Sequence, residues 1–86
     1  MGLMYAATVI VHPPPEATSA AKEQFRTFLQ QQDPHYPIEH VHIRDGPEQL
    51  QVTLFLRTPT QHEANLLGYH LCAQTIRRLP GWRLDT

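Results

Sequence analysis

The stretch Leu50-Gln51-Val52-Thr53-Leu54-Phe55-Leu56-Arg57 decides the fold. Positions 50, 52, 54 and 56 are all leucine or valine, and mostly polar residues stand between them. A period of two is typical of a β-strand that buries one face. Directly after it, a capping box can start a helix at Thr58, with Gln61 at the third helical position, or at Thr60, with Glu63 there. We therefore place residues 50–57 at the centre of the fold.

The eight prolines punctuate the rest of the chain, because each one removes a backbone donor and fixes φ. Between them, alternation predicts strands and a spacing of three to four predicts helices. In the second strand, Glu39, Val41 and Ile43 should share one face and Ile38, His40, His42 and Arg44 the other. The predicted elements are a strand over Met4–His12, a helix over Glu16–Gln32, strands over Ile38–Arg44 and Leu50–Arg57, a second helix ending at Leu79-Pro80-Gly81, and a strand over Trp82–Asp85.

This order, β-α-β-β-α-β, predicts an α+β fold in one domain, residues 1–86. The turn Asp45-Gly46-Pro47-Glu48 joins the second and third strands into an antiparallel hairpin. With right-handed crossovers, the chain forms a four-stranded antiparallel sheet of order 4-1-3-2 with both helices on one face. That is the ferredoxin-like split βαβ arrangement. The topology names no function, because many unrelated functions use it.

Composition restricts the classes of partner. Seven Lys or Arg against eight Asp or Glu leave a formal charge of -1, so electrostatics gives no reason to expect DNA or an anionic membrane. An RNA-binding sheet would need more aromatic residues than Phe55 on its central strands. No run is long enough to span a bilayer. Cys72 is the one cysteine, which excludes an internal disulfide and fits a reducing, cytoplasmic setting.

The sheet face away from the helices is the candidate binding surface. Arginine and histidine side chains gather there, which suits a small anionic ligand, although a sheet face that simply meets water is the commoner case. Cys72 is expected to be a buried thiol and not a nucleophile. We recognise no catalytic motif. The candidate ligand-binding residues are His12, His40, His42, Arg44, Gln51 and Arg57.

His40 and His42 are the candidates for a metal ligand pair. On a strand their Cα atoms would lie about 6.6 Å apart on one side, a spacing at which two imidazoles can share a divalent ion. A third ligand would be needed, and His12, two strands away at roughly 9.5–10 Å, is stretched for that role. Because two ligands do not make a site, we predict no metal and no cofactor.

The second helix carries a surplus apolar stripe. Leu66, Tyr69 and Ala73 are spaced i, i+3, i+7 opposite the predicted core face. A helix with one buried face has no need of a second stripe, although scattered surface hydrophobes are ordinary. We therefore expect a contact with a second copy or with another protein. Ile10 and Phe55 on the sheet face form a competing contact surface.

From these residues we predict a small association domain without catalytic activity that acts through protein–protein contacts as a homodimer. A small-molecule or anion binder, with an enzyme of the dimeric α+β barrel sort as its catalytic form, is the alternative. Its binding surface would be the His- and Arg-rich sheet face. The two hypotheses differ in whether that face is covered by a second chain, closed over a cavity or open to water.

Overall fold

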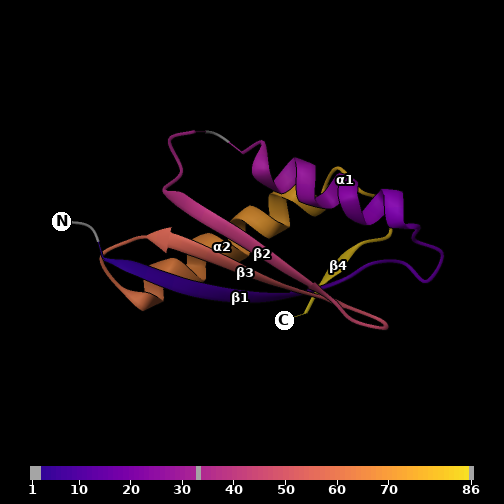
Figure 1. Ribbon diagram of the computed structural model, residues 1–86, viewed down its shortest axis with the longest axis horizontal. Coiled ribbons are helices and arrows are strands. Elements are labelled where there is room, and N and C mark those ends of the chain that lie inside the picture. The colour runs from indigo at the N-terminus through magenta and orange to yellow at the C-terminus, as the bar shows by residue number, and fades with distance from the viewer. Residues whose placement is uncertain (1–2, 33, 86) are drawn as a thin grey trace.

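The computed structural model describes residues 3–32 and 34–85 (Figure 1). The chain forms an α+β structure with a four-stranded antiparallel sheet and two helices, in the predicted order of elements. The elements are β1 (Met4–His12), α1 (Ser19–Gln30), β2 (Ile38–Asp45), β3 (Leu50–Arg57), α2 (Gln61–Ile76) and β4 (Arg83–Leu84).

The strands lie in the order β2-β3-β1-β4, and every neighbouring pair is antiparallel. Read from the β4 edge, this is the sequence 4-1-3-2. β3 pairs along its whole length with both β1 and β2, so the alternating stretch is indeed central. In the register, Thr53 stands opposite Thr8 of β1 on one side and opposite His42 of β2 on the other.

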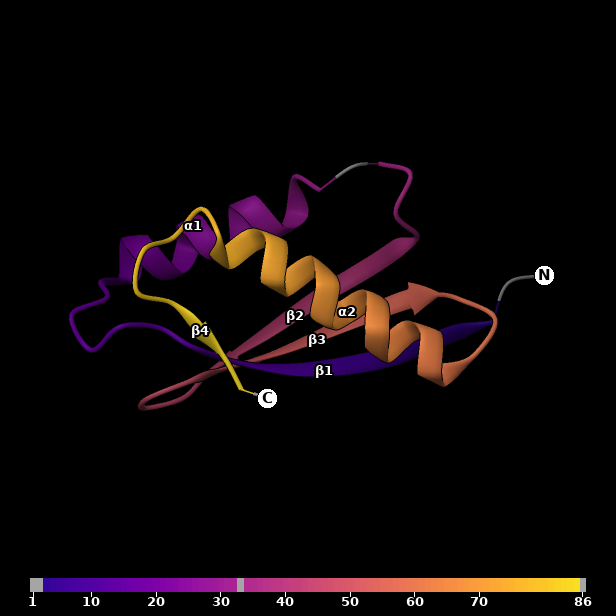
Figure 2. The same ribbon diagram turned by 180° about the vertical axis from the view of Figure 1, so that it is seen from behind.

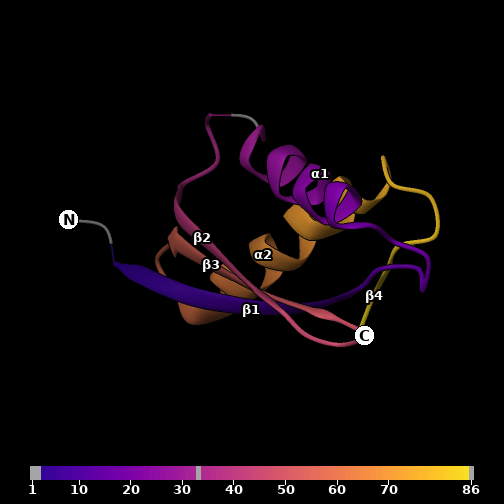
Figure 3. The ribbon, with the colours of Figure 1, turned by 45° about the vertical axis from the view of Figure 1, so that its right-hand side comes forward.

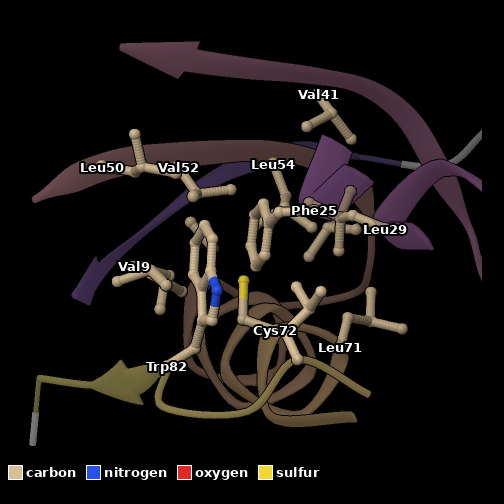
Figure 4. Close-up of a cluster of buried hydrophobic side chains, with 14 of the residues drawn as sticks. Val9, Phe25, Leu29, Val41, Leu50, Val52, Leu54, Leu71, Cys72 and Trp82 are labelled. Atoms are coloured by element: carbon tan, nitrogen blue, oxygen red, sulfur yellow. The ribbon is translucent and has the colours of Figure 1, made fainter. Parts of the chain in front are cut away.

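One face of the sheet carries the core. The inward side chains of β3, from Leu50 to Leu56, are buried, and so are Ala7, Val9 and Val11 of β1. α1 and α2 both contribute to this single cluster, so they cover the same face (Figure 4). Figure 3 shows α1 lying next to the C-terminal half of α2. The other face, named here the open face, is covered by neither helix of the described residues.

A close approach between α2 and β1 fixes the helix on the sheet. A Cβ placed on Gly68 would lie 2.9 Å from the Cβ of Ala7, closer than real Cβ contacts come. Glycine at position 68 is therefore what lets the helix sit this near the strand. Both residues are buried, so the contact belongs to the core.

The structure corrects the predicted start of α1 and decides between the two predicted starts of α2. α1 begins at Ser19 and not at Glu16, because the Thr18 side chain caps it by accepting a hydrogen bond from the Ala21 N–H at 3.1 Å. α2 is capped by Thr60, whose hydroxyl accepts from the Glu63 N–H at 3.1 Å. Thr58 is buried instead, and its hydroxyl donates to the Thr60 carbonyl.

The predicted alternation in β2 is wrong at its first residues. Ile38 pairs with Leu56 while His40 pairs with Phe55, so Glu39 is an extra residue in a β-bulge. The bulge turns Ile38 to the core side, where it packs against the cluster. Glu39, predicted to face the core, is exposed. From Val41 onward the predicted faces are correct.

β4 is shorter than the predicted strand over Trp82–Asp85. Trp82 precedes the strand, is buried, and stacks on Phe25 with ring centroids 5.2 Å apart. β4 therefore pairs only with Val11 and His12 of β1. Within the described residues, neither helix has the length and the hydropathy needed to cross a bilayer.

Candidate functional site

The candidate ligand-binding residues on β2 and β3 do gather on the open face. His42, Thr53 and Thr8 form one row across three strands, and the two threonine hydroxyl oxygens lie 3.5 Å apart. Arg44 and Gln51 form the next row. Their side chains are exposed or half-buried. We call His40, His42, Arg44, Gln51 and Thr53 the open-face patch.

His40 lies beside Phe55 at one end of this patch. The two residues are a cross-strand pair, and their ring centroids are 5.9 Å apart in a tilted arrangement. Phe55 is half-buried, and so is Ile10 on the neighbouring strand. These two candidate interface residues therefore offer less apolar surface than their sequence positions imply.

His12 lies far from His40 and His42. It lies four residues beyond Thr8 along β1, about 13 Å further along the strand than the His42 row. Its Nε2 stands 4.0 Å from the Asp85 Oδ1 at the opposite end of the sheet. The register therefore rules out His12 as a third ligand for His40 and His42. No group of three His, Cys, Asp or Glu within residues 3–32 and 34–85 could hold a metal ion.

The Arg57 guanidinium forms an ion pair that the sequence pattern did not predict. The bulge in β2 releases Glu39 from the core side, and its carboxylate pairs with the Arg57 guanidinium. Both side chains remain substantially exposed, so this pair adds little stability. It does reduce the positive charge available to a ligand at that end of the open face.

Three open depressions border the sheet, and four of the six candidate residues line one or another of them. Arg44 and Gln51 line an open depression of about 520 Å³ beside the β2–β3 turn. His12 lines another of about 510 Å³ with Lys22 and Arg83, and His40 lines a third of about 320 Å³. None of these three depressions brings together more than two of the six candidates.

The outer face of α2 carries two of the three residues of the predicted apolar stripe as exposed side chains. Leu66 is 60% exposed and Tyr69 is 42% exposed, and both belong to the few large apolar side chains that remain exposed in the described chain. Ala73 continues the same stripe and is half-buried. We call Leu66, Tyr69 and Ala73 the outer stripe. One neighbour, His70, is held by an edge contact with Tyr36, at 6.4 Å between ring centroids.

The sequence patterns missed two features of the sheet. One is the bulge at Glu39, for which the only signal is a charged residue at an expected core position. The other is the outward side of β1 from Met4 to Val9, along which no strand lies in the part of the chain that the structure describes.

Comparison with known proteins adds no relative: no family model, no curated protein and no solved structure matches this chain.

Proposed function

We propose that this protein is a small, non-catalytic association domain that forms a homodimer through the outer stripe of α2. The observation that carries the proposal is a helix with apolar side chains on both sides. Ala64, Leu71 and Cys72 are buried in the core, while Leu66 and Tyr69 on the opposite side are exposed. Burying such a stripe is the usual reason for a second copy to associate.

The distribution of charge on α2 favours a second copy as the partner. Its outer side carries Glu63 near the start, and Arg77 directly follows the last turn. Two copies of α2 packed antiparallel would place Leu66 against the partner's Ala73 and Glu63 beside the partner's Arg77. Both ends of such an interface would then pair opposite charges, and the two-fold symmetry would repeat each contact.

We propose further that the fold is the ferredoxin-like split βαβ arrangement. Support comes from the element order and from the strand order β2-β3-β1-β4 with both helices on the core side. A cytoplasmic location is part of the same proposal. It rests on the one cysteine, Cys72, a free and buried thiol that fits a reducing compartment.

The test of the homodimer is the mass in solution over a range of protein concentrations. We expect about twice the chain mass of 9.9 kDa for the wild type and the chain mass itself for Leu66→Glu. Gln24→Glu is the matched control, because it adds the same charge at an exposed helical position away from the stripe. A wild type that stays at 9.9 kDa at the highest concentration overturns the proposal.

The antiparallel arrangement has a test of its own. Glu63→Arg should weaken association, because the introduced guanidinium then lies beside the partner's Arg77. Each such like-charge pair costs about 0.2–1 kcal/mol of binding free energy. Adding Arg77→Glu to that variant should restore association by reversing the pair. If the double variant associates no better than Glu63→Arg alone, the two helices do not pack antiparallel in this register.

The second candidate function is binding of a small anion at the open-face patch. The observation that favours it is the row of two hydroxyls, Thr53 and Thr8, beside the His42 imidazole, with Arg44 in the neighbouring row. Hydroxyl, imidazole and guanidinium groups all donate to phosphate or carboxylate oxygens. Titration with inorganic phosphate should shift the amide resonances of β2 and β3, and replacing His40 and His42 together should abolish the shifts. Unshifted resonances at millimolar phosphate would remove this candidate.

A further inference from the structure

The outward side of β1 lacks a strand over most of its length. β4 pairs with Val11 and His12, and the Asp85 N–H donates to the Ile10 carbonyl at 3.0 Å. Beyond this point, from Met4 to Val9, the described residues place no strand on that side. β3 runs along the other side throughout. Figure 2 shows β4 ending partway along β1. We call this stretch the free edge.

The hydrogen bonds identify the backbone groups that face the free edge. The Leu3 carbonyl accepts from the Thr58 N–H, so odd-numbered residues point toward β3. The Ile10 carbonyl accepts from the Asp85 N–H on the opposite side. Both backbone groups of a residue point the same way in an antiparallel strand. Met4, Ala6 and Thr8 therefore present their N–H and C=O groups to the free edge.

A side chain of α2 already imitates the missing strand. The Gln61 Nε2 donates to the Ala6 carbonyl at 2.8 Å, as a backbone N–H of a neighbouring strand would. The same amide group donates to the Asn65 Oδ1 one turn later. In Figures 1 and 2 the first turn of α2 lies beside this part of β1. The space beside the free edge is thus bordered by the first turn of α2, and the Gln61 amide occupies one of its backbone acceptors.

The two edges of the sheet differ in their protection. β2, at the far edge, has a bulge and carries charged residues such as Glu39, Arg44 and Asp45. Bulges and charges are the usual means of preventing edge-to-edge pairing. Residues 3–11 include no Asp, Glu, Lys or Arg. Leu3 and Met4, at the start of the free edge, are 59% and 57% exposed. The free edge therefore remains suited to accept another strand.

We propose that the free edge is a strand-addition site for an extended segment of a partner protein. The segment runs antiparallel to β1, in line with β4, and spans about six residues from Val9 to Met4. Its side chains are uncharged, and those on the helix side are apolar, because they lie beside the buried Ala7 and Val9. It pairs with the outward groups of Met4, Ala6 and Thr8, and it displaces the Gln61 amide from the Ala6 carbonyl.

A second copy of β1 does not fit this site. Each copy carries its own α2, whose first turn is tied to the same edge through Gln61. Two β1 edges paired about Ala6 would bring two such turns into the same space above the sheet. Helices need 8–10 Å between their axes, whereas paired strands lie only about 4.8 Å apart. The occupant is therefore a segment with no helix above it, and the proposal does not depend on the homodimer.

The probe for this site is a blocked hexapeptide of alternating threonine and valine. At millimolar concentration we expect it to shift the amide resonances of Met4, Ala6 and Thr8 and to slow their hydrogen exchange about tenfold or more. The amides of Ala7 and Val9, which face β3, should be unchanged. No response at the three outward amides overturns the proposal. The monomeric Leu66→Glu variant should bind the peptide as well as the wild type, so this outcome is separate from that of the homodimer.

Two variants and a modified peptide test the geometry. Ala6→Pro removes one outward N–H and leaves the β1–β3 ladder intact, so it should abolish binding while the variant stays folded. Gln61→Ala frees the Ala6 carbonyl and should tighten binding severalfold.

If Ala6→Pro fails to fold, modified peptides provide the test. N-methylation of one alternate set of the peptide amides should abolish binding, and methylation of the other set should not. Equal binding of both methylated peptides, or unchanged affinity for Gln61→Ala, contradicts strand addition.

Discussion

Cys72 lies in the core, where its sulfur points from α2 toward the Trp82 and Phe25 rings (Figure 4). Burial raises the pKa of its thiol to about 12 from an ordinary value of 9.0. The folded protein therefore keeps this thiol neutral at all moderately alkaline pH values. Since the thiolate is the reactive form, Cys72 is a structural residue and not a nucleophile.

The raised pKa of Cys72 predicts a pH dependence of stability. Above pH 9.0 the thiol ionises in the unfolded chain and stays protonated in the folded one. The free energy of unfolding should therefore fall as the pH rises from 9.0 toward about 12, and be unaffected by this group below 9.0. Denaturant unfolding of the wild type and of Cys72→Ala on both sides of pH 9.0 measures the difference. The same alkaline slope in both proteins would contradict the assignment.

At the scale of elements, the contact between α2 and β1 depends on one missing side chain. Gly68 is unfavourable within a helix by about 0.8–1.0 kcal/mol relative to alanine. The structure retains it where a Cβ would collide with Ala7. The helix therefore gives up local stability in exchange for close packing on the strand.

Gly68→Ala should destabilise the protein for this reason. Overpacking costs about 1–3 kcal/mol, which exceeds the gain in helix propensity. The midpoint of denaturant unfolding should fall, and adding Ala7→Gly to the variant should recover part of the loss by making room. A Gly68→Ala protein as stable as the wild type would show that α2 can move away from β1 at no cost.

The bulge in β2 also acts at the scale of an element. One extra residue, Glu39, exchanges the faces of its neighbours, so Ile38 joins the core and Glu39 pairs with Arg57. A strict alternation would have buried the carboxylate of Glu39, which is costly without a partner. The bulge avoids that cost and gives the far edge of the sheet a feature that discourages pairing.

The whole molecule presents three unlike surfaces. The open face carries imidazole and guanidinium groups, and the outer stripe of α2 carries Leu66 and Tyr69. The free edge of β1 carries backbone groups that no strand of the described residues pairs. A chain of this length buries only about 60–65% of its unfolded surface, so association has a larger effect on its stability than in a large domain. The homodimer proposal therefore predicts that thermal stability depends on protein concentration.

If the protein is a homodimer, its thermal midpoint should rise with protein concentration, because dissociation accompanies unfolding. The dependence should vanish in Leu66→Glu and persist in Gln24→Glu. Thermal unfolding monitored by the fluorescence of the buried Trp82 measures it. A concentration-independent midpoint in the wild type would indicate that the outer stripe contributes no stabilising contact.

The amino-acid sequence by itself determined the elements and their order. It also determined which face each strand buries, except at the first residues of β2, before Val41. These features are local: alternation, helical spacing, proline positions and capping residues act over a few neighbours. The exposed stripe of α2 was predictable on the same ground, because the helical period places Leu66 and Tyr69 opposite the core residues.

Only the tertiary structure decided the Glu39 bulge, the choice of Thr60 as the cap of α2, the shortness of β4 and the separation of His12 from His42. Each of these depends on the register between strands or on competition for the core, which joins residues far apart in the chain. Trp82 leaves the last strand because Phe25 offers it a stacked, buried site.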